Sequence, residues 1–170
     1  MRLLTRVIAS AVALSVSFAA SVVQAQVGGI AVGATAPTLT LPSLSGAPVD
    51  LASMIGKKPM VIEFWATWCP LCKKLEPQLE KARTAYGDKV AFIGVGVSQN
   101  QSAERQLAYV KEKQMTGQFL FDQDGAAVKA FQVPHTSFVV VIDAAGKVVY
   151  TGVGAEQVID DAVRKALPTR

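Results

Sequence analysis

The two cysteines of the chain, Cys69 and Cys72, are separated by two residues and follow an apolar stretch. Residues 63–77 read EFWATWCPLCKKLEP, and Pro70 stands directly after the first cysteine, where a helical pattern begins. Three kinds of chemistry fit such a pair: a structural disulfide, part of a metal site, or a dithiol that opens and closes. A structural cross-link is not needed for folding, because a chain of this length can bury an adequate core without one.

The position of the pair at a helix start favours redox chemistry. Cys69 is expected at the N-terminus of the helix, where the amide groups and the positive end of the helix dipole stabilise a thiolate. A thiolate is the attacking species in disulfide exchange, so Cys69 is predicted to be the exposed nucleophile. Cys72, one turn inside the helix, is predicted to be the more buried thiol, which resolves the mixed disulfide and releases the reduced partner.

Glu63 is the one carboxylate in the apolar run MVIEFW, residues 60–65, which leads directly to the cysteines. A buried Cys72 thiol needs a base, and burial would raise the pKa of Glu63 toward neutrality and suit it to proton transfer. The alternative is a hydrated glutamate with no role. Trp65 and Trp68 are expected to shape the floor and rim around the pair, and core packing alone explains Trp65 equally well.

The elements around the pair predict an α/β fold. Buried strands are expected over residues 60–65, 90–97 and 138–142, and helices over residues 70–86, 103–113 and 155–167. Shorter elements are expected as strands at 38–41, 49–51, 119–121 and 147–150 and as a helix at 126–131. Strands that alternate with helices and end in a hairpin and a helix predict a mixed sheet, with the three buried strands at its centre.

The N-terminal segment has the pattern of a secretory signal. Residues 1–6 carry two arginines, residues 7–20 are apolar and uncharged, and small residues precede position 26. We expect residues 1–25 to be a signal peptide cleaved after Ala25, and the protein to be periplasmic. The alternative is an uncleaved membrane anchor, although the run is marginal for a spanning helix of roughly 20 residues. Residues 26–36 are predicted to be a flexible leader, and residues 37–170 to form the folded domain.

The charge balance does not indicate a nucleic-acid partner. The chain has 17 basic and 13 acidic residues, and removal of the signal would take away two of the basic ones. No run of five or more basic residues occurs, and export argues further against nucleic-acid binding.

The segment FWATWCPLCKKLEP resembles the active-site segment of the thioredoxin superfamily and is most similar to its exported TlpA/ResA-like branch. VGATAP at residues 32–37, the hairpin after it, and the final hairpin at residues 139–149 match the same branch. The resemblance implies a thioredoxin-like fold with a central mixed sheet and an N-terminal β-hairpin extension. In this family Glu63 falls at the place of the buried aspartate that assists the second cysteine.

The resemblance also implies a function. It implies a protein disulfide oxidoreductase with a redox-active disulfide at Cys69 and Cys72, acting in cell redox homeostasis without a required cofactor. A reductase is the favoured direction, with electrons from a membrane reductant of the DsbD/CcdA type and substrates in cytochrome c or copper-site maturation. Trp68, Pro70, Thr136 and Ser137 are the expected substrate contacts.

One departure from the family concerns the loop that faces the disulfide. Thioredoxin-like proteins carry a cis-proline there, and the loop backbone pairs with an incoming peptide. Counted back from Asp143 without gaps, the proline position falls on Ser137, and Pro134 lies three residues earlier. Either the loop is offset or the cis-proline is missing. We favour the second, with a trans peptide before Ser137, because a non-proline cis bond costs about 3–4 kcal/mol.

His135, the only histidine, lies in the same loop. In this register V-x-H-T resembles the loop of Sco-type copper chaperones, and two thiolates with one imidazole suit copper. A copper-binding chaperone using Cys69, Cys72 and His135 is therefore the alternative function, although Sco proteins have three residues between their cysteines and this chain has two. A surface histidine without a role, or one that handles a proton or contacts substrate, also fits.

Overall fold

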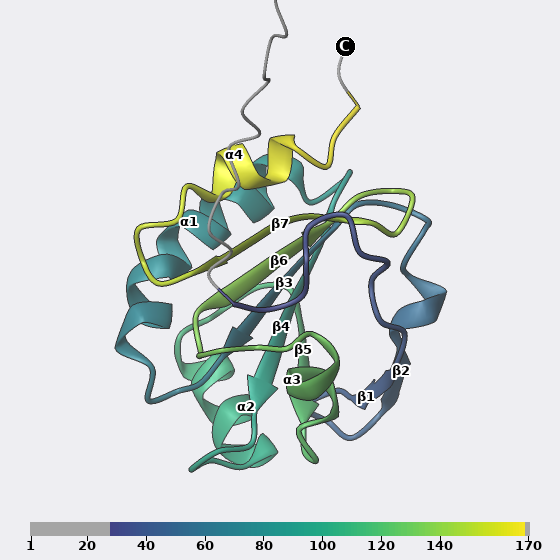
Figure 1. Cartoon of the computed structure of the whole chain (residues 1–170). Coiled ribbons are helices and arrows are strands. Elements are labelled where there is room, and N and C mark those ends of the chain that lie inside the picture. Colours follow the sequence, from purple (N-terminus) through teal and green to yellow (C-terminus); the bar gives the residue numbers. More distant parts are fainter. Residues whose placement is uncertain (1–27, 169–170) are drawn as a thin grey trace, which may run out of the picture.

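The structure, a computed structural model, describes residues 28–168. Figure 1 shows a five-stranded sheet with helices around it and a separate two-stranded hairpin at one side. The strand order is β5-β4-β3-β6-β7, with β3 parallel to β4 and antiparallel to β6. The strands are β3 (Met60–Trp65), β4 (Ala91–Val97), β5 (Gln118–Asp122), β6 (Phe138–Ile142) and β7 (Val148–Val153). The predicted mixed sheet and its three central strands are confirmed.

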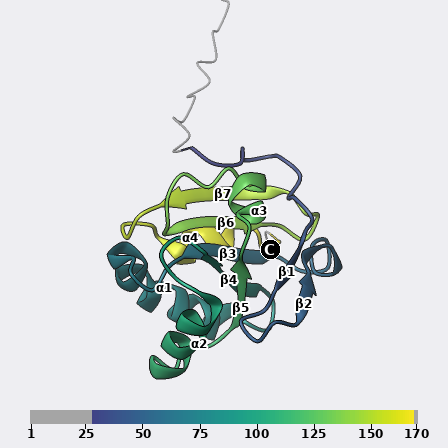
Figure 2. The ribbon, with the colours of Figure 1, turned by 90° about the horizontal axis from the view of Figure 1, so that it is seen from below.

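Helices and loops lie on both faces of the sheet (Figure 2), and a cluster of buried apolar side chains packs on each face. Helices α1 (Pro70–Tyr86) and α4 (Ile159–Arg164) pack together on one face. The other face is covered by α3 (Ala126–Ala130), by the N-terminal residues, and by the hairpin of β1 (Thr40–Pro42) and β2 (Pro48–Asp50), which a 3₁₀ helix (Leu51–Ser53) follows. Helix α2 (Ala103–Glu112) packs near the start of α1.

Strand β3 determines which side chains meet α1. Successive side chains of a strand point to opposite faces of the sheet. Met60, Ile62 and Phe64 accordingly join the core under α3 and the hairpin, whereas Val61 joins the core under α1. Glu63 therefore lies on the α1 face, between Val61 and Trp65.

Two glycines of β4 make room on this same face. Gly94 is paired with Glu63 and Gly96 with Trp65. A Cβ atom on Gly94 would lie 3.1 Å from the indole nitrogen of Trp65, and one on Gly96 would overlap the side-chain amide of Gln106 on α2. Because Gly94 and Gly96 have no side chains, the indole ring of Trp65 and the Gln106 side chain of α2 can pack closely against β4.

The predicted flexible leader at residues 26–36 is wrong for residues 28–36. Ile30 and Ala36 are buried in the core, the Ile30 amide donates to the carbonyl of Phe131 at 2.9 Å, and the Ala36 amide donates to that of Gly146 at 2.9 Å. Apolar burial and backbone pairing hold this segment on the domain. The predicted signal peptide at residues 1–25 lies outside the described residues.

The last helix also differs from its prediction, since it begins at Ile159 rather than at residue 155. Gly154 has a φ of +93°, and the side chain of Gln157 donates to the carbonyls of Ser137 and Gly154, so residues 154–158 form a connection. Among residues 28–168, no helix combines the length and the apolar character that crossing a membrane requires.

Replacement of Ile30 tests whether the N-terminal segment belongs to the domain. Ile30→Ala is expected to lower the free energy of unfolding by about 2–4 kcal/mol, because it deletes a buried side chain and leaves a cavity. Urea denaturation of the oxidised protein measures the change. Val32→Ala is the matched control, since Val32 is 55% exposed and its truncation should change stability by less than about 0.5 kcal/mol. Equal effects of the two substitutions would contradict the packing of this segment.

Candidate active site

The two cysteines form a disulfide at the first turn of α1, with their Cα atoms 5.4 Å apart. Cys69 is the N-cap residue, and its sulfur accepts a hydrogen bond of 3.0 Å from the Cys72 amide. Pro70 occupies the first helical position, where its missing N–H would have had no partner within the helix. The helix start therefore presents amide groups to the Cys69 sulfur, as the sequence predicts.

The exposure of the cysteines differs from the prediction. Cys69 is 2% exposed and Cys72 is 5% exposed, so the expected contrast between an exposed Cys69 and a buried Cys72 is wrong for the disulfide form. Both cysteines pack in one buried cluster with Trp65, Ala66 and Val97. Exposure alone therefore does not distinguish the roles of the two cysteines.

Side chains from the loop after β4 hold the segment in front of Cys69. The amide and hydroxyl of Thr67 both donate to Gln101 Oε1 at 3.0 Å, and Gln101 Nε2 donates to the carbonyl of Val97 at 2.6 Å. Trp68 Nε1 donates to the carbonyl of Gln99 at 2.8 Å. This loop is not predictable from the sequence, because it acts through the uncharged side chain of Gln101 and the backbone carbonyl of Gln99, which carry no chemical signal of their own.

Three exposed residues surround the disulfide at the surface. Trp68, Pro70 and Leu71 are exposed although all three are apolar. Trp68 and Pro70 therefore lie where the sequence analysis expected substrate contacts.

Glu63 is buried on the α1 face of β3, and its Oε1 atom has no hydrogen-bond partner among the described residues. The pKa of Glu63 is raised from 4.5 to about 8, mainly by burial; the negative charge of Glu76 contributes to the rise, and the Arg83 guanidinium opposes it. The predicted direction of the pKa shift and its main cause, loss of hydration, are confirmed.

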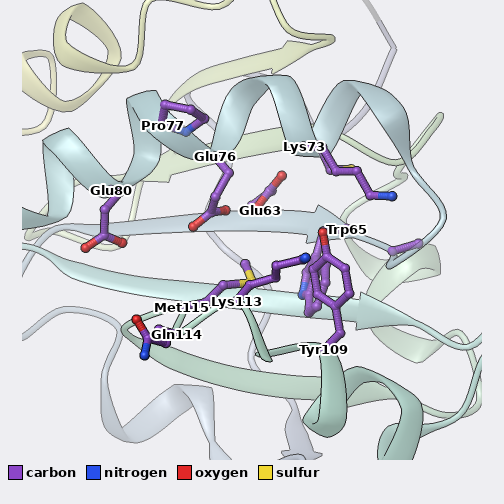
Figure 3. A pocket seen from close by; sticks show the side chains of 12 residues that line it. Glu63, Trp65, Lys73, Glu76, Pro77, Glu80, Tyr109, Lys113, Gln114 and Met115 are labelled. Atoms are coloured by element: carbon purple, nitrogen blue, oxygen red, sulfur yellow. The ribbon is translucent and has the colours of Figure 1, made fainter. Parts of the chain in front are cut away.

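Glu63 and Cys72 line one cavity of about 380 Å³ between α1 and α2 (Figure 3). Its apolar wall includes Trp65 and Tyr109, whose ring centroids are 6.0 Å apart. The full lining is Glu63, Trp65, Ala66, Cys72, Lys73, Glu76, Pro77, Glu80, Tyr109, Lys113, Gln114 and Met115. The cavity connects the buried carboxyl group of Glu63 with side chains at the surface.

A row of charged residues on α1, made of Glu76, Glu80 and Arg83, was not among the predicted site residues; Glu76 and Glu80 line this cavity, and Arg83 lines a second void with Glu63. Cys72, Glu76 and Glu80 are spaced by four residues, and Arg83 follows three residues later. Residues at such spacings share one face of a helix, so the pattern was present in the sequence. Arg83 pairs with Glu80 and lies 3.8 Å from Glu76.

The loop at the proline position has a trans peptide, because residues 28–168 contain no cis peptide bond. Ser137 is fully buried in the left-handed conformation, with a φ of +65°. Its amide donates to the carbonyl of Phe64 at 2.8 Å, and its hydroxyl accepts from the Gly154 amide at 3.1 Å. The Gln157 side chain donates to the Ser137 carbonyl at 2.9 Å. The favoured prediction of a missing cis-proline is confirmed, but the Ser137 side chain is not at the surface as a substrate contact would require.

His135 and the cysteines do not share a site. His135 is exposed and, with Thr136 and Gln99, lines a separate hollow of about 260 Å³ that includes neither cysteine. Within residues 28–168, no group of three His, Cys, Asp or Glu side chains is arranged to hold a metal ion, and both sulfurs are bonded to each other. The copper alternative has no support from this arrangement.

The fold and the site together define a thioredoxin-like protein with a redox disulfide at the start of a helix. The chain belongs to the Redoxin family, whose sequence model matches residues 31–167. The resemblance to the thioredoxin superfamily is thereby confirmed.

Individual relatives agree with this assignment. The chain is 36% identical over 98 residues to the thioredoxin-like protein YneN of Bacillus subtilis, covering 57% of each chain. It is 25% identical to the thiol-disulfide oxidoreductase ResA of Bacillus thuringiensis, covering 81% of this chain and 79% of ResA. The chain thus spans little more than half the length of YneN and about four fifths of ResA.

Solved structures show the same fold. A secreted disulfide oxidoreductase of Mycobacterium tuberculosis, described as homologous to E. coli DsbE, superimposes with a TM-score of 0.64 at 29% identity, covering 75% of this chain and 94% of that one. The DsbF protein from MTB, solved in mixed oxidised and reduced forms, superimposes with a TM-score of 0.66 at 26% identity. The match covers 78% of this chain and 97% of that one.

Replacement of Ser137 tests the geometry of the loop. Ser137→Pro is expected to lower the free energy of unfolding by more than about 1 kcal/mol, because proline cannot adopt a positive φ and has no N–H for the Phe64 carbonyl. Ser137→Gly keeps the N–H and tolerates the conformation, so it should be much less destabilising. Chemical denaturation of both variants measures this, and a proline variant as stable as the serine protein would contradict the observed loop.

The stability of the protein should depend on pH through Glu63. The folded protein holds this proton up to about pH 8, whereas the unfolded chain releases it near pH 4.5. The free energy of unfolding should therefore fall as the pH rises through this window, by at most about 1.4 kcal/mol per pH unit from this group.

Urea denaturation between about pH 5 and pH 8 measures this slope, and Glu63→Gln should flatten it. Glu156→Gln, which removes an exposed carboxylate instead, is the control and should leave the slope unchanged. A Glu63→Gln protein with the original slope would show that Glu63 does not titrate in this range.

Proposed function

We propose that the protein is an exported thiol–disulfide oxidoreductase that acts as a reductase of protein disulfides. The observation that carries the proposal is the Cys69–Cys72 disulfide at the start of α1, with the buried carboxyl of Glu63 in the same cavity as Cys72. The relative named ResA and the secreted structure homologous to DsbE are described as disulfide oxidoreductases, which supports the same activity.

In the reduced protein, Cys69 is the nucleophile. Its thiolate, stabilised by the amides at the helix start, attacks a substrate disulfide, so that one substrate sulfur leaves as a thiolate and the other becomes bonded to Cys69. Cys72 then gives its proton to Glu63 in those molecules in which Glu63 is ionised, a fraction that grows as the pH rises toward about 8, and attacks the Cys69 sulfur. This closes the Cys69–Cys72 disulfide, releases the second substrate thiolate, and transfers two electrons from the protein to the substrate.

The substrate is expected to bind over the exposed apolar surface beside the disulfide. Trp68 and Pro70 are exposed there, and Thr136 is partly exposed in the loop that precedes β6. The buried Ser137 fixes this loop through its backbone bond to Phe64, so its expected contribution is positional.

The expected export rests on the pattern of residues 1–25, and the expected partners rest on the family resemblance. The segment at residues 1–25 fits a cleaved secretory signal, and one structural relative is described as secreted, which supports a periplasmic location. In that compartment the Cys69–Cys72 disulfide needs a source of electrons, for which a membrane reductant of the DsbD/CcdA type is the expected partner. Substrates in cytochrome c or copper-site maturation are the expected class, and membrane association would require the signal to remain uncleaved.

Cysteine substitution tests the direction of attack. Cys72→Ser, expressed in full length in a Gram-negative host, is expected to accumulate mixed disulfides with periplasmic proteins, because the attacking thiol is kept and the resolving thiol is lost. Non-reducing gels of periplasmic extracts, prepared after acid quenching, measure these adducts.

Cys69→Ser is the matched control and should form far fewer adducts, since the first attack is then lost. Adducts that form mainly on the Cys69→Ser protein would reverse the two roles. Adducts confined to the cytosolic fraction would contradict export, and an unsubstituted protein unable to reduce insulin would contradict the reductase assignment.

A further inference from the structure

The charged row on α1 and the buried Glu63 meet in the cavity between α1 and α2. In Figure 3 the side chains of Glu76 and Glu63 both lie in the space between α1 and the sheet. The negative charge of Glu76 is, after burial, the second influence that raises the pKa of Glu63, so the two carboxyl groups interact electrostatically. Glu76 is only partly buried, whereas Glu63 is almost completely buried. Glu76 thus reaches solvent from the cavity that it shares with the buried Glu63.

The ionisable groups that face Glu63 come from α1 and from α2 with the residue after it. On the sheet, its neighbours in β4 and β6 are Gly94 and Val139, which carry no charge. The ionisable groups that share a lining with Glu63 are Cys72, Lys73, Glu76, Glu80 and Arg83 on α1, and Tyr109 and Lys113 from α2 and the residue after it. Lys73 and Lys113 each lie 5.9 Å from the ring centre of Tyr109 and are exposed at the mouth.

Arg83 is held in place by groups other than Glu76. It pairs with Glu80, whose two carboxylate oxygens also accept the hydroxyl of Thr116 at 3.0 and 3.1 Å. From this fixed position the guanidinium lies 3.8 Å from Glu76 and shares the lining of a second void, of about 10 Å³, with Glu63. The arrangement keeps one positive charge near both carboxyl groups and orients Glu76.

The pKa values of the groups suit proton exchange between them. Burial raises the pKa of Glu76 as it does that of Glu63, and Arg83 opposes the rise at both. Proton transfer is most efficient when donor and acceptor have similar proton affinities, and a raised pKa brings Glu63 toward that of a thiol.

We propose that Glu76 is a positioning residue for the resolving step: its carboxylate, oriented by Arg83, shares the cavity with Glu63 and passes the Glu63 proton to solvent. This inference rests on the proposed function. In the step itself the Cys72 S–H bond breaks and an O–H bond forms on Glu63. Glu63 then loses that proton to Glu76, and Glu76 loses it to water at the cavity mouth, so both carboxylates are restored and no electrons move between them.

The Glu76→Gln substitution tests the proposal, because it removes the charge and the proton acceptor while keeping the size of the side chain. The pKa of Glu63, followed by NMR in oxidised protein carrying ¹³C-labelled glutamate, is expected to fall from about 8 by roughly half a unit to one unit. The pH profile of the resolving step, followed by rapid mixing of the reduced protein with a peptide disulfide, should move to lower pH by the same amount and reach a lower maximum.

Two further variants make the outcome specific. Glu104→Gln removes an exposed carboxylate at the start of α2, away from the cavity, and should change neither readout. Glu76→Asp keeps the charge and should restore most of the original Glu63 pKa, which a purely structural role of the Glu76 side chain would not do.

An unchanged Glu63 pKa and pH profile in Glu76→Gln would overturn the proposal, and so would a shift of equal size in Glu104→Gln. The NMR titration needs no substrate, so it gives its answer even if the protein fails to reduce disulfides. Loss of insulin reduction in the unsubstituted protein would count against the proposed function, whereas an unchanged Glu63 titration in Glu76→Gln counts against the role of Glu76 alone.

Discussion

The hydrogen bond from the Cys72 amide to the Cys69 sulfur joins the chemistry of this protein to the start of a helix. It exists because β3 ends at Trp65 and the chain turns within four residues into α1, with Cys69 as the N-cap and Pro70 at the first helical position. The same strand carries Glu63 on the face that α1 covers. One strand and one helix therefore position the two cysteines and the buried carboxyl group of Glu63 together.

Periodicity in the sequence predicts most of the scaffold. The apolar runs at β3, β4 and β6 and the helical spacing of α1 are strong patterns, because each element buries one continuous set of side chains. A carboxylate inside an apolar run is a signal of the same kind, which is why Glu63 is predictable. The start of α4 is not, since it depends on the contacts of Gln157 with a loop distant in the sequence.

The parts that sequence patterns fail to predict depend on tertiary contacts. The burial of Cys69 follows from packing against Trp65 and Val97, residues of two different strands. The left-handed Ser137 is fixed by the Phe64 carbonyl and by the Gln157 side chain, in place of the rigidity that a cis-proline supplies in thioredoxin-like relatives. The charged row on α1 has a regular spacing, but charged residues at such spacing are usual on exposed helices, and only the cavity distinguishes it.

The packing of the first described residues bears on how the protein can be joined to other molecules. A Cβ atom on Gly28 would lie 3.4 Å from Pro134, and Gly29 packs against the ring of Phe138, so residue 28 sits beside the loop that precedes β6. In Figure 1 the last helix, α4, lies at the opposite end of the sheet from the start of α1. A fluorescent label, resin linkage or fusion partner attached after α4 is therefore separated from the start of α1 by the length of the sheet, whereas one attached just before residue 28 lies beside the loop that precedes β6.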